Sequence, residues 1–261
     1  MVKSVIQNIP TYSMATFKLP ISFCRSLDKM TRKFWWSGKC AQGNFLALRR
    51  WDRLCQPKNC GGLGFRKFED TNLALLAKLG WKVATDPNAM WVNLLRQKYC
   101  RIDSFFSVEP KKSDSSGWKD VLGTRNFIKE SAVFLVGNGK GVKVFDDFWC
   151  FDDRLVRQKA GTMGGPALVS ELLLPSVCWW NEVLVRQWCD EENAEVILRT
   201  RIMLGNRTNK LIWKPNELRN FSVKSAARWL SHGGFDPKDK FCGIVCGRYR
   251  FMRGVSFFCG V

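Results

Sequence analysis

The chain has a single histidine, His232, and only 23 acidic residues against 42 lysines and arginines in its 261 residues. A Ser-His-Asp or Cys-His nucleophilic centre would have to be built on that histidine. His232 follows an expected helix, however, and a histidine at a helix C-terminus interacts favourably with the helix dipole. The sequence therefore favours a structural place for His232 over a catalytic one.

Long apolar runs are also absent. No stretch approaches the ~18 apolar residues of a membrane span, and Met1-Val2-Lys3-Ser4 leads into no apolar signal segment. Eleven cysteines, an odd number at irregular spacing, do not suit a disulfide framework. We therefore expect no membrane partner and an intracellular, reducing location, with nucleus and cytoplasm both open.

Three cysteines near the end of the chain raise the question of zinc. Cys242, Cys246 and Cys259, together with His232, could form a Cys₃His site, because thiolates and imidazole suit tetrahedral zinc. Structural zinc sites have tighter paired spacing, and the residues around these cysteines are aromatic and basic. We expect no metal there, and we interpret the other cysteines as small buried hydrophobic residues.

The excess of basic residues gives a formal net charge of +19. Such an excess favours polyanionic partners through phosphate neutralisation and counterion release, although it also fits a merely soluble basic protein. The excess is concentrated in residues 1–67, which carry only Asp28 and Asp52 as acids, whereas residues 190–195 are acidic. A nucleic acid is therefore expected on the N-terminal third, and no small-molecule substrate is evident.

Residues 51–83 contain the clearest structural signals. Pro57 and the Gly61-Gly62 pair predict a break in regular structure. Glu69-Asp70 suits a helix N-terminus, and apolar residues then recur at helical spacing until Asp86-Pro87 ends the helix. The apolar positions of this predicted helix are Leu75, Leu76, Leu79 and Val83.

A second predicted helix lies near residues 23–36. Phe23, Leu27, Met30 and Phe34 form an apolar stripe that we expect to face the core, with basic residues on the rest of the surface. Those charges could follow a phosphate backbone or could be an ordinary solvated face. The predicted nucleic-acid-binding residues of the N-terminal third are Lys18, Arg25, Lys29, Arg32, Lys33, Arg49, Arg50, Lys58, Arg66 and Lys67.

The remaining pattern predicts an α+β fold that is mainly α-helical with two short β-hairpins. One hairpin joins residues 132–136 to 142–145 through Gly137–Gly141, and the other joins 211–213 to Phe221 through a turn at Asn216. Because a strand and not a helix follows Gly137–Gly141, this glycine-rich turn is a poor candidate for phosphate binding. A further helix is expected over 89–99, with Trp91, Leu94 and Leu95 facing inward. Other helices are expected over 118–129, 179–188, 191–199 and 223–230, the last with Ser222 as N-cap.

Adjacent acids at Asp146-Asp147, echoed at Asp152-Asp153, have the form of a polymerase metal pair. Polymerases place two such acids on a hairpin, with a third on a neighbouring strand, to hold two Mg²⁺ ions. Here the pair follows the second predicted strand instead of occupying the turn, and no upstream strand supplies a third acid. We therefore expect a solvated or capping role and predict no catalytic residue.

Several motifs resemble, in the same order, the region downstream of the polymerase core in plant LINE-type (non-LTR) retroelement reverse transcriptases. The resemblance covers residues 4–230, and its motifs are Ile9-Pro10-Thr11-Tyr12, Phe17-Lys18-Leu19-Pro20, Phe34-Trp35-Trp36, Pro57-Lys58, Gly61-Gly62-Leu63-Gly64-Phe65-Arg66, Asn72 to Trp81, and Phe221-Ser222-Val223-Lys224-Ser225-Ala226. The segment from Phe241 is similar to the opening of the zinc-binding segment of those proteins, with cysteine where tryptophan is usual.

The resemblance implies a thumb-like or connection-like helical region over 1–110, a connection region with hairpins over 111–230, and a truncated start of a zinc-binding-like segment over 231–261. It implies RNA or an RNA–DNA duplex as the partner. The catalytic aspartates of that family lie in a palm that this sequence lacks, so Mg²⁺ is expected only where a polymerase core is present. The alternatives are a degenerate element product without a selected role, or a chain that retains RNA-directed DNA polymerase activity.

Overall fold

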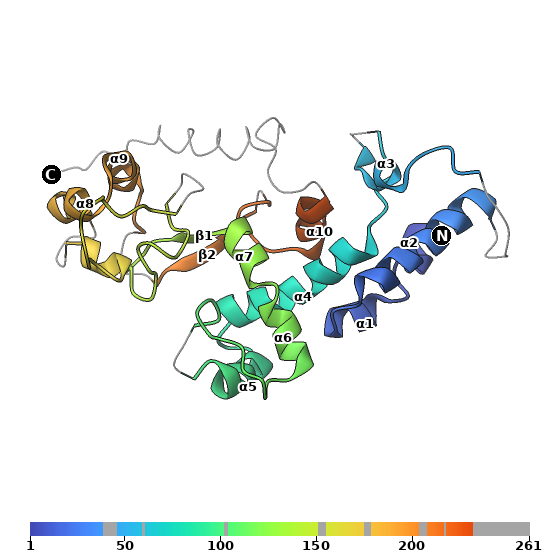
Figure 1. The fold of residues 1–261 in the computed structure, drawn as a ribbon, viewed down its shortest axis with the longest axis horizontal. Helices are drawn as coiled ribbons and strands as arrows, with labels where there is room; N and C mark the ends of the chain where they lie inside the picture. Colours follow the sequence, from blue (N-terminus) through green and yellow to red (C-terminus); the bar gives the residue numbers. More distant parts are fainter. Residues whose placement is uncertain are drawn as a thin grey trace, which may run out of the picture. The chain divides into compact units, whose positions relative to one another are not determined.

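The computed structural model describes residues 1–38, 46–58, 61–101, 104–150, 155–174, 179–203, 208–216 and 218–231. Within these ranges the chain is mainly helical and carries one two-stranded antiparallel sheet (Figure 1). The predicted mainly helical α+β class is therefore confirmed. No helix in the described ranges is long and apolar enough to cross a membrane.

The chain forms two compact units whose segments alternate along the sequence. Unit 1 comprises Met1–Trp81, Val108–Thr124 and the segment that begins at Phe221, and unit 2 comprises Lys82–Ser107 and Arg125–Asn220. The three ranges proposed from the sequence remain a prediction.

Unit 1 is built from helices. Its elements are η1 (Val2–Ile6), α1 (Thr11–Thr16), α2 (Ile21–Ser37), α3 (Trp51–Cys55), α4 (Phe68–Thr85) as far as Trp81, α6 (Ser116–Leu122) and α10 (Val223–Ser231). The expected stop of α4 before Asp86-Pro87 is confirmed. The single helix expected over 118–129 is instead divided at Gly123-Thr124, and α7 (Arg125–Ser131) follows.

Asn72 of α4 fixes the segment between α1 and α2. Its Nδ2 donates to the carbonyl oxygens of Met14 (2.7 Å) and Phe17 (2.8 Å), and its Oδ1 accepts from the backbone N–H of Leu19 (2.8 Å). The side-chain amide thus satisfies three backbone groups that no helix or strand pairs, next to the buried side chains of Met14, Cys24 and Phe68.

The glycine pair after α3 closes a tight turn. Gly61 has a φ of 76°, and a Cβ on Gly62 would lie 2.0 Å from the carbonyl oxygen of Gln56, so only glycine fits there. The backbone N–H groups of Leu63 and Phe65 then donate to the carbonyl oxygen of Leu54. The break predicted from the sequence is confirmed, and it brings Phe65 beside α3.

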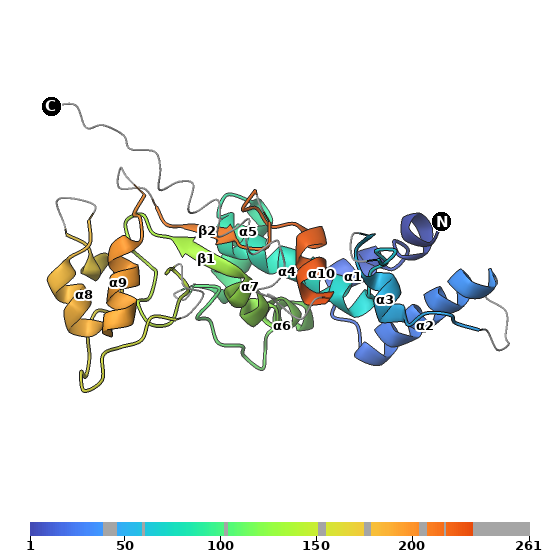
Figure 2. The same cartoon turned by 90° about the horizontal axis from the view of Figure 1, so that it is seen from above.

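Helix α10 lies against the part of α4 in unit 1 (Figures 1 and 2). Ser231 Oγ donates to Asp70 Oδ2 at 2.6 Å, and the rings of Trp81 and Phe221 stack with centroids 5.6 Å apart. The predicted N-cap is confirmed, because Ser222 Oγ accepts from the backbone N–H of Ser225 at 3.1 Å.

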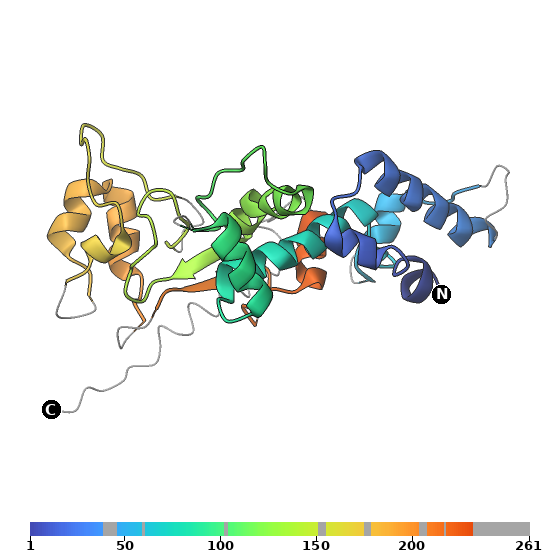
Figure 3. The same ribbon diagram turned by 90° about the horizontal axis from the view of Figure 1, so that it is seen from below.

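Unit 2 contains the sheet and the remaining helices. Its elements are α5 (Met90–Tyr99), α7, β1 (Ala132–Leu135), η3 (Val169–Leu172), α8 (Glu182–Trp188), α9 (Glu191–Arg199) and β2 (Lys210–Trp213). Helices α8 and α9 lie side by side (Figures 1 and 3). Buried Trp149 and Trp180 pack with ring centroids 5.5 Å apart in the core that these elements enclose.

The two predicted hairpins are wrong, although the first strand of each, β1 and β2, is present. Strand β1 pairs with β2 in an antiparallel register that joins Ala132 to Trp213 and Leu135 to Lys210. The segment after the glycine turn pairs elsewhere: the N–H of Val144 donates to Ala167 and that of Val169 to Val142. A register between strands more than 70 residues apart leaves no local sequence signal, so turn chemistry suggested the nearer partners.

The inward faces of two helices also differ from the prediction. In α2 the fully buried residues are Cys24 and Thr31, while Phe23 is 50% and Met30 is 60% exposed. In α5 the buried residue is Val92, whereas Leu94, expected inward, is 59% exposed. Apolar spacing identified both helices, but the face that meets the core depends on where the neighbouring elements lie.

Candidate nucleic-acid interface

Helix α2 carries the densest set of predicted phosphate contacts. Pro20 precedes its first turn, and Gly38, with a φ of 68°, ends it in the left-handed conformation that favours glycine. This set is Arg25, Lys29, Arg32 and Lys33, and we call it the basic stripe. Residues three or four positions apart, such as Arg25 and Lys29, lie next to each other on the surface of a helix.

The stripe lies largely on the solvent side of the helix. Arg25 and Lys29 are exposed, Arg32 and Lys33 are half-buried, and the buried residues lie on the opposite side. Among the described residues none of the four side chains has an ion-pair partner. Their charges are therefore not neutralised by the described part of the protein.

The one acid of α2 is turned away from this surface. Asp28 Oδ1 accepts a hydrogen bond from Trp51 Nε1 of α3 at 3.0 Å. Burial raises the pKa of Asp28 to about 6, and the hydrogen bond from Trp51 lowers it only in part. Asp28 thus joins α2 to α3 instead of pairing with a member of the basic stripe.

The other predicted residues fall into two groups. Lys18, Arg49, Arg50, Lys58 and Arg66 are exposed, and Arg49 and Arg50 directly precede the Trp51 that bonds α2. Lys67 instead forms an ion pair with Asp52, with Nζ and Oδ1 2.7 Å apart. That pair raises the pKa of Lys67 and lowers that of Asp52, so Lys67 already has an anionic partner.

The aromatic residues around Trp35 mostly contact one another. The ring of Phe65 lies edge-on to Trp35, with centroids 5.1 Å apart, and stacks on Trp51 at 5.4 Å. Lys3 Nζ lies 5.8 Å from the centroid of Phe65. Phe65 is buried and offers no free ring face, whereas Trp35, expected in the core, is 42% exposed.

Sequence reasoning missed an exposed apolar edge on α2. Phe23 and Met30, assigned inward by their spacing, lie at the surface and are seven residues apart, almost two full turns. We call these two residues the apolar edge. The signal that could have located it is the polar Asp28 and Thr31 on the face that is in fact turned inward.

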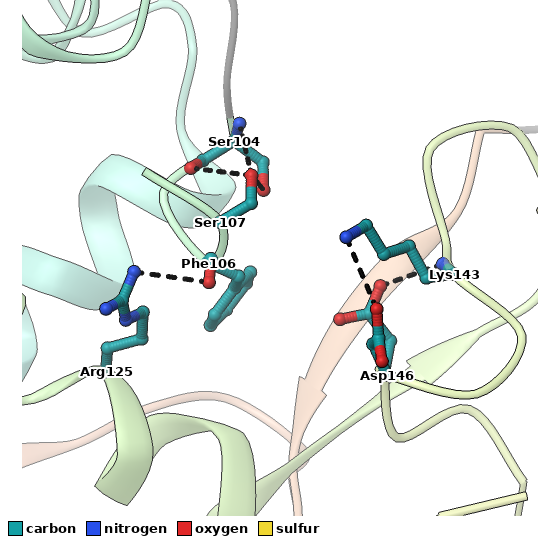
Figure 4. A network of polar contacts seen from close by, with 7 residues as sticks. Ser104, Phe106, Ser107, Arg125, Lys143 and Asp146 are labelled. Atoms are coloured by element: carbon teal, nitrogen blue, oxygen red, sulfur yellow. Dashed lines mark hydrogen bonds and ion pairs between the residues drawn. The ribbon is translucent and has the colours of Figure 1, made fainter. Parts of the chain in front are cut away.

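The contacts of Asp146 and Asp147 in unit 2 are those of structural and solvated acids and not of a metal-binding pair. Asp147 is 9% exposed, and its Oδ2 accepts from the backbone N–H of Lys143 at 2.9 Å. Asp146 is exposed and forms an ion pair with Lys143 Nζ at 3.3 Å, as Figure 4 shows beside the separate contact from Arg125 to the carbonyl of Phe106. Burial raises the pKa of Asp147. One acid caps a turn and the other is solvated.

The glycine-rich turn before this pair is held by a side chain. Asn209 Oδ1 accepts from the backbone N–H groups of Gly137 (2.9 Å) and Gly139 (3.0 Å), and its Nδ2 donates to the carbonyl of Lys140 (2.6 Å). Asn209 therefore occupies amide groups that a phosphate would need.

Among the described residues, no three His, Cys, Asp or Glu side chains gather closely enough to hold a metal ion. His232, Cys242, Cys246, Cys259, Asp152 and Asp153 lie outside the described residues. The expectation that these cysteines and His232 bind no metal, and that Asp152 and Asp153 are not catalytic, therefore stays a prediction.

Two plant proteins are similar to this chain. It is 28% identical over 235 residues to "Putative ribonuclease H protein At1g65750" of Arabidopsis thaliana, a match that covers 88% of this chain and 38% of that protein. The chain thus spans well under half of that longer relative. No family model and no solved structure matches.

The second relative is shorter. Over 146 residues the chain is 30% identical to "Uncharacterized mitochondrial protein AtMg00310" of Arabidopsis thaliana, and this match covers 56% of this chain and 94% of that protein. Both relatives are plant proteins, as the sequence led us to expect. The chain belongs to the same family as the Arabidopsis mitochondrial protein AtMg00310.

Proposed function

We propose that this chain is a non-catalytic nucleic-acid-binding part of a protein derived from a plant retroelement, and that it grips RNA or an RNA–DNA duplex through phosphate contacts. The observation that carries the proposal is the basic stripe of α2, whose charges have no ion-pair partner among the described residues. Such a row neutralises phosphates and releases counterions without reading bases.

Two further points support the proposal. The sequence motifs resemble the region beyond the polymerase core of non-LTR retroelement reverse transcriptases, which would contact a template–primer duplex. The longer Arabidopsis relative is named for ribonuclease H, an activity directed at RNA–DNA hybrids. The cap formed by Asp147 and the exposure of Asp146 argue against a retained polymerase centre.

The test is duplex binding by the full chain, measured by fluorescence anisotropy across a salt series. When Arg25→Gln and Lys29→Gln are combined, we expect the log–log salt slope to shrink by about 0.9 for each phosphate that the chain no longer neutralises, taking the B-DNA coefficient as a guide. Affinity should fall alike for every duplex sequence, because phosphate contacts carry no sequence information.

A matched control removes the same charge from unit 2. Arg157 and Lys159 are exposed, and Arg157→Gln with Lys159→Gln should leave the slope nearly unchanged. If the α2 variant folds and binds with unaltered affinity and slope, the proposal is wrong, and the degenerate product without a selected role becomes the better interpretation.

A further inference from the structure

The solvent side of α2 is divided into rows of different chemistry. Arg25, Lys29 and Lys33 follow one another at intervals of four residues and form a row about 12 Å long. Beside it, Ser22 and Ser26, also four residues apart, are both exposed. The helix therefore presents cations and then hydroxyl groups.

The apolar edge completes this arrangement. Phe23 is three residues before Ser26, and Met30 is four residues after Ser26 and three before Lys33. These spacings make each pair neighbours on the helix surface. An exposed ring and a thioether thus lie within one helical turn of the cationic row, across a strip of hydroxyl groups.

This order matches the chemistry of an unpaired nucleotide strand. Such a strand offers phosphates on one side and the flat faces of its bases on the other, and aromatic side chains in single-strand-binding proteins stack on those faces. In a duplex the bases are paired and stacked within the helix, so the ring of Phe23 would have no base face to meet. Between the two rows, the Ser22 hydroxyl can donate to a phosphate or sugar oxygen. Ser26 Oγ donates to the carbonyl oxygen of Ser22 at 3.0 Å and can accept a hydrogen bond from a sugar hydroxyl.

We infer that the apolar edge of α2 receives an unpaired base while the basic stripe holds the adjoining phosphates, so that this surface prefers single-stranded segments to blunt duplex. The inference rests on the proposed function, since it uses the same stripe for the backbone. It adds the class of nucleic acid and assigns Phe23 and Met30 as base-contacting residues.

A basic helix with an apolar edge could also meet an anionic membrane surface. The exposed apolar residues of α2 do not form one broad face, which argues for the nucleotide strand. Phe23 and Met30 form the apolar edge, whereas Ile21 and Trp35, which are also exposed, lie at helical spacing from Arg25 and Arg32 on the other side of the basic stripe. Leu27 and Phe34 pack inside unit 1. Interfacial helices bury a broad apolar face in the lipid.

The experiment compares Phe23→Ala with wild type on four 20-nucleotide probes: single-stranded RNA, single-stranded DNA, a single strand with abasic central positions, and a blunt RNA–DNA duplex. We expect affinity to fall by about fivefold or more on the two strands with bases, which corresponds to one stacked base. Affinity for the abasic strand and the blunt duplex should be unchanged, because those probes place no base on the ring. Phe23→Tyr should retain the wild-type affinities.

Tyr12→Ala is the matched control. Tyr12 is an aromatic residue of α1 with 87% exposure, and α1 carries no charged residue beside it. Circular dichroism and thermal melting of each variant confirm that it folds.

The outcomes separate the two proposals. Weaker binding by the combined Arg25→Gln and Lys29→Gln variant, with no effect of Phe23→Ala on any probe, overturns the base contact and keeps the phosphate contact. No effect of either change overturns both. An equal fall in affinity on all four probes for Phe23→Ala, or binding to phosphatidylserine vesicles that Phe23→Ala abolishes, would also overturn the inference.

Discussion

The carboxylate of Asp28 in α2 accepts a hydrogen bond from the indole N–H of Trp51 in α3, with Oδ1 and Nε1 3.0 Å apart. This contact joins the helix that carries the basic stripe to the helix that follows Arg49 and Arg50. Burial raises the pKa of Asp28 to about 6, Asp70 adds to that rise, and Lys67 opposes it.

The raised pKa predicts the pH dependence of stability. Because the folded state binds the proton of Asp28 more tightly than the unfolded state, this group's contribution is fully present below about pH 3.8 and is lost as the pH rises through about 6. Asp28→Asn keeps an acceptor for Trp51 and removes the titration. We therefore expect the free energy of unfolding of the variant, relative to that of wild type, to rise by about 1–2 kcal/mol from pH 4 to pH 7, after allowance for the partial exposure of Asp28.

Urea unfolding of both proteins at several pH values measures this difference. Other carboxylates titrate in the same pH range, so the test uses the difference between the unfolding free energies of wild type and variant at each pH. A difference that stays constant with pH, or that favours wild type as the pH rises, would contradict the assignment.

Removal of the Asn72 amide should destabilise unit 1. Asn72→Ala leaves the carbonyls of Met14 and Phe17 and the N–H of Leu19 without their partner, and we expect a cost of about 2–4 kcal/mol. Asn8→Ala is the control, because Asn8 is exposed and should cost less than about 0.5 kcal/mol. Chemical denaturation compares them, and similar costs for the two variants would show that the three bonds contribute little.

A pair of leucine substitutions tests which helix faces are buried. Leu76 of α4 is fully buried, so Leu76→Ala should cost about 2–5 kcal/mol. Leu94 of α5 is 59% exposed, and Leu94→Ala should cost less than about 1 kcal/mol. A large cost at Leu94 in the same denaturation experiment would restore the inward face that the spacing in α5 predicts.

The acidic pair should act on stability unequally. Asp147→Ala removes the buried acceptor for the backbone N–H of Lys143 and is expected to cost about 1–3 kcal/mol. Asp146→Ala removes only an exposed ion pair and should change stability by less than about 0.5 kcal/mol. Thermal and chemical unfolding measure both effects, and primer extension with Mg²⁺ and Mn²⁺ should be absent for all three proteins. Extension by wild type that either substitution abolishes would instead indicate a catalytic pair.

Local chemistry in the sequence determined most of the elements. Apolar spacing and Asp86-Pro87 predicted the extent of α4, the serine at position 222 predicted an N-cap, and Gly61-Gly62 predicted a tight turn. Each of these features depends on residues only a few positions apart. The cluster of basic residues in the N-terminal third is likewise a property of the sequence alone.

Only the tertiary structure decided which partners these elements have. The pairing of β1 with β2, the division of the chain into interleaved units and the inward face of α2 depend on contacts between residues far apart in sequence. Apolar spacing gives the period of a helix but not the direction of the core. For that reason Phe23 and Met30, which the sequence assigned to the core, lie at the surface beside the basic stripe.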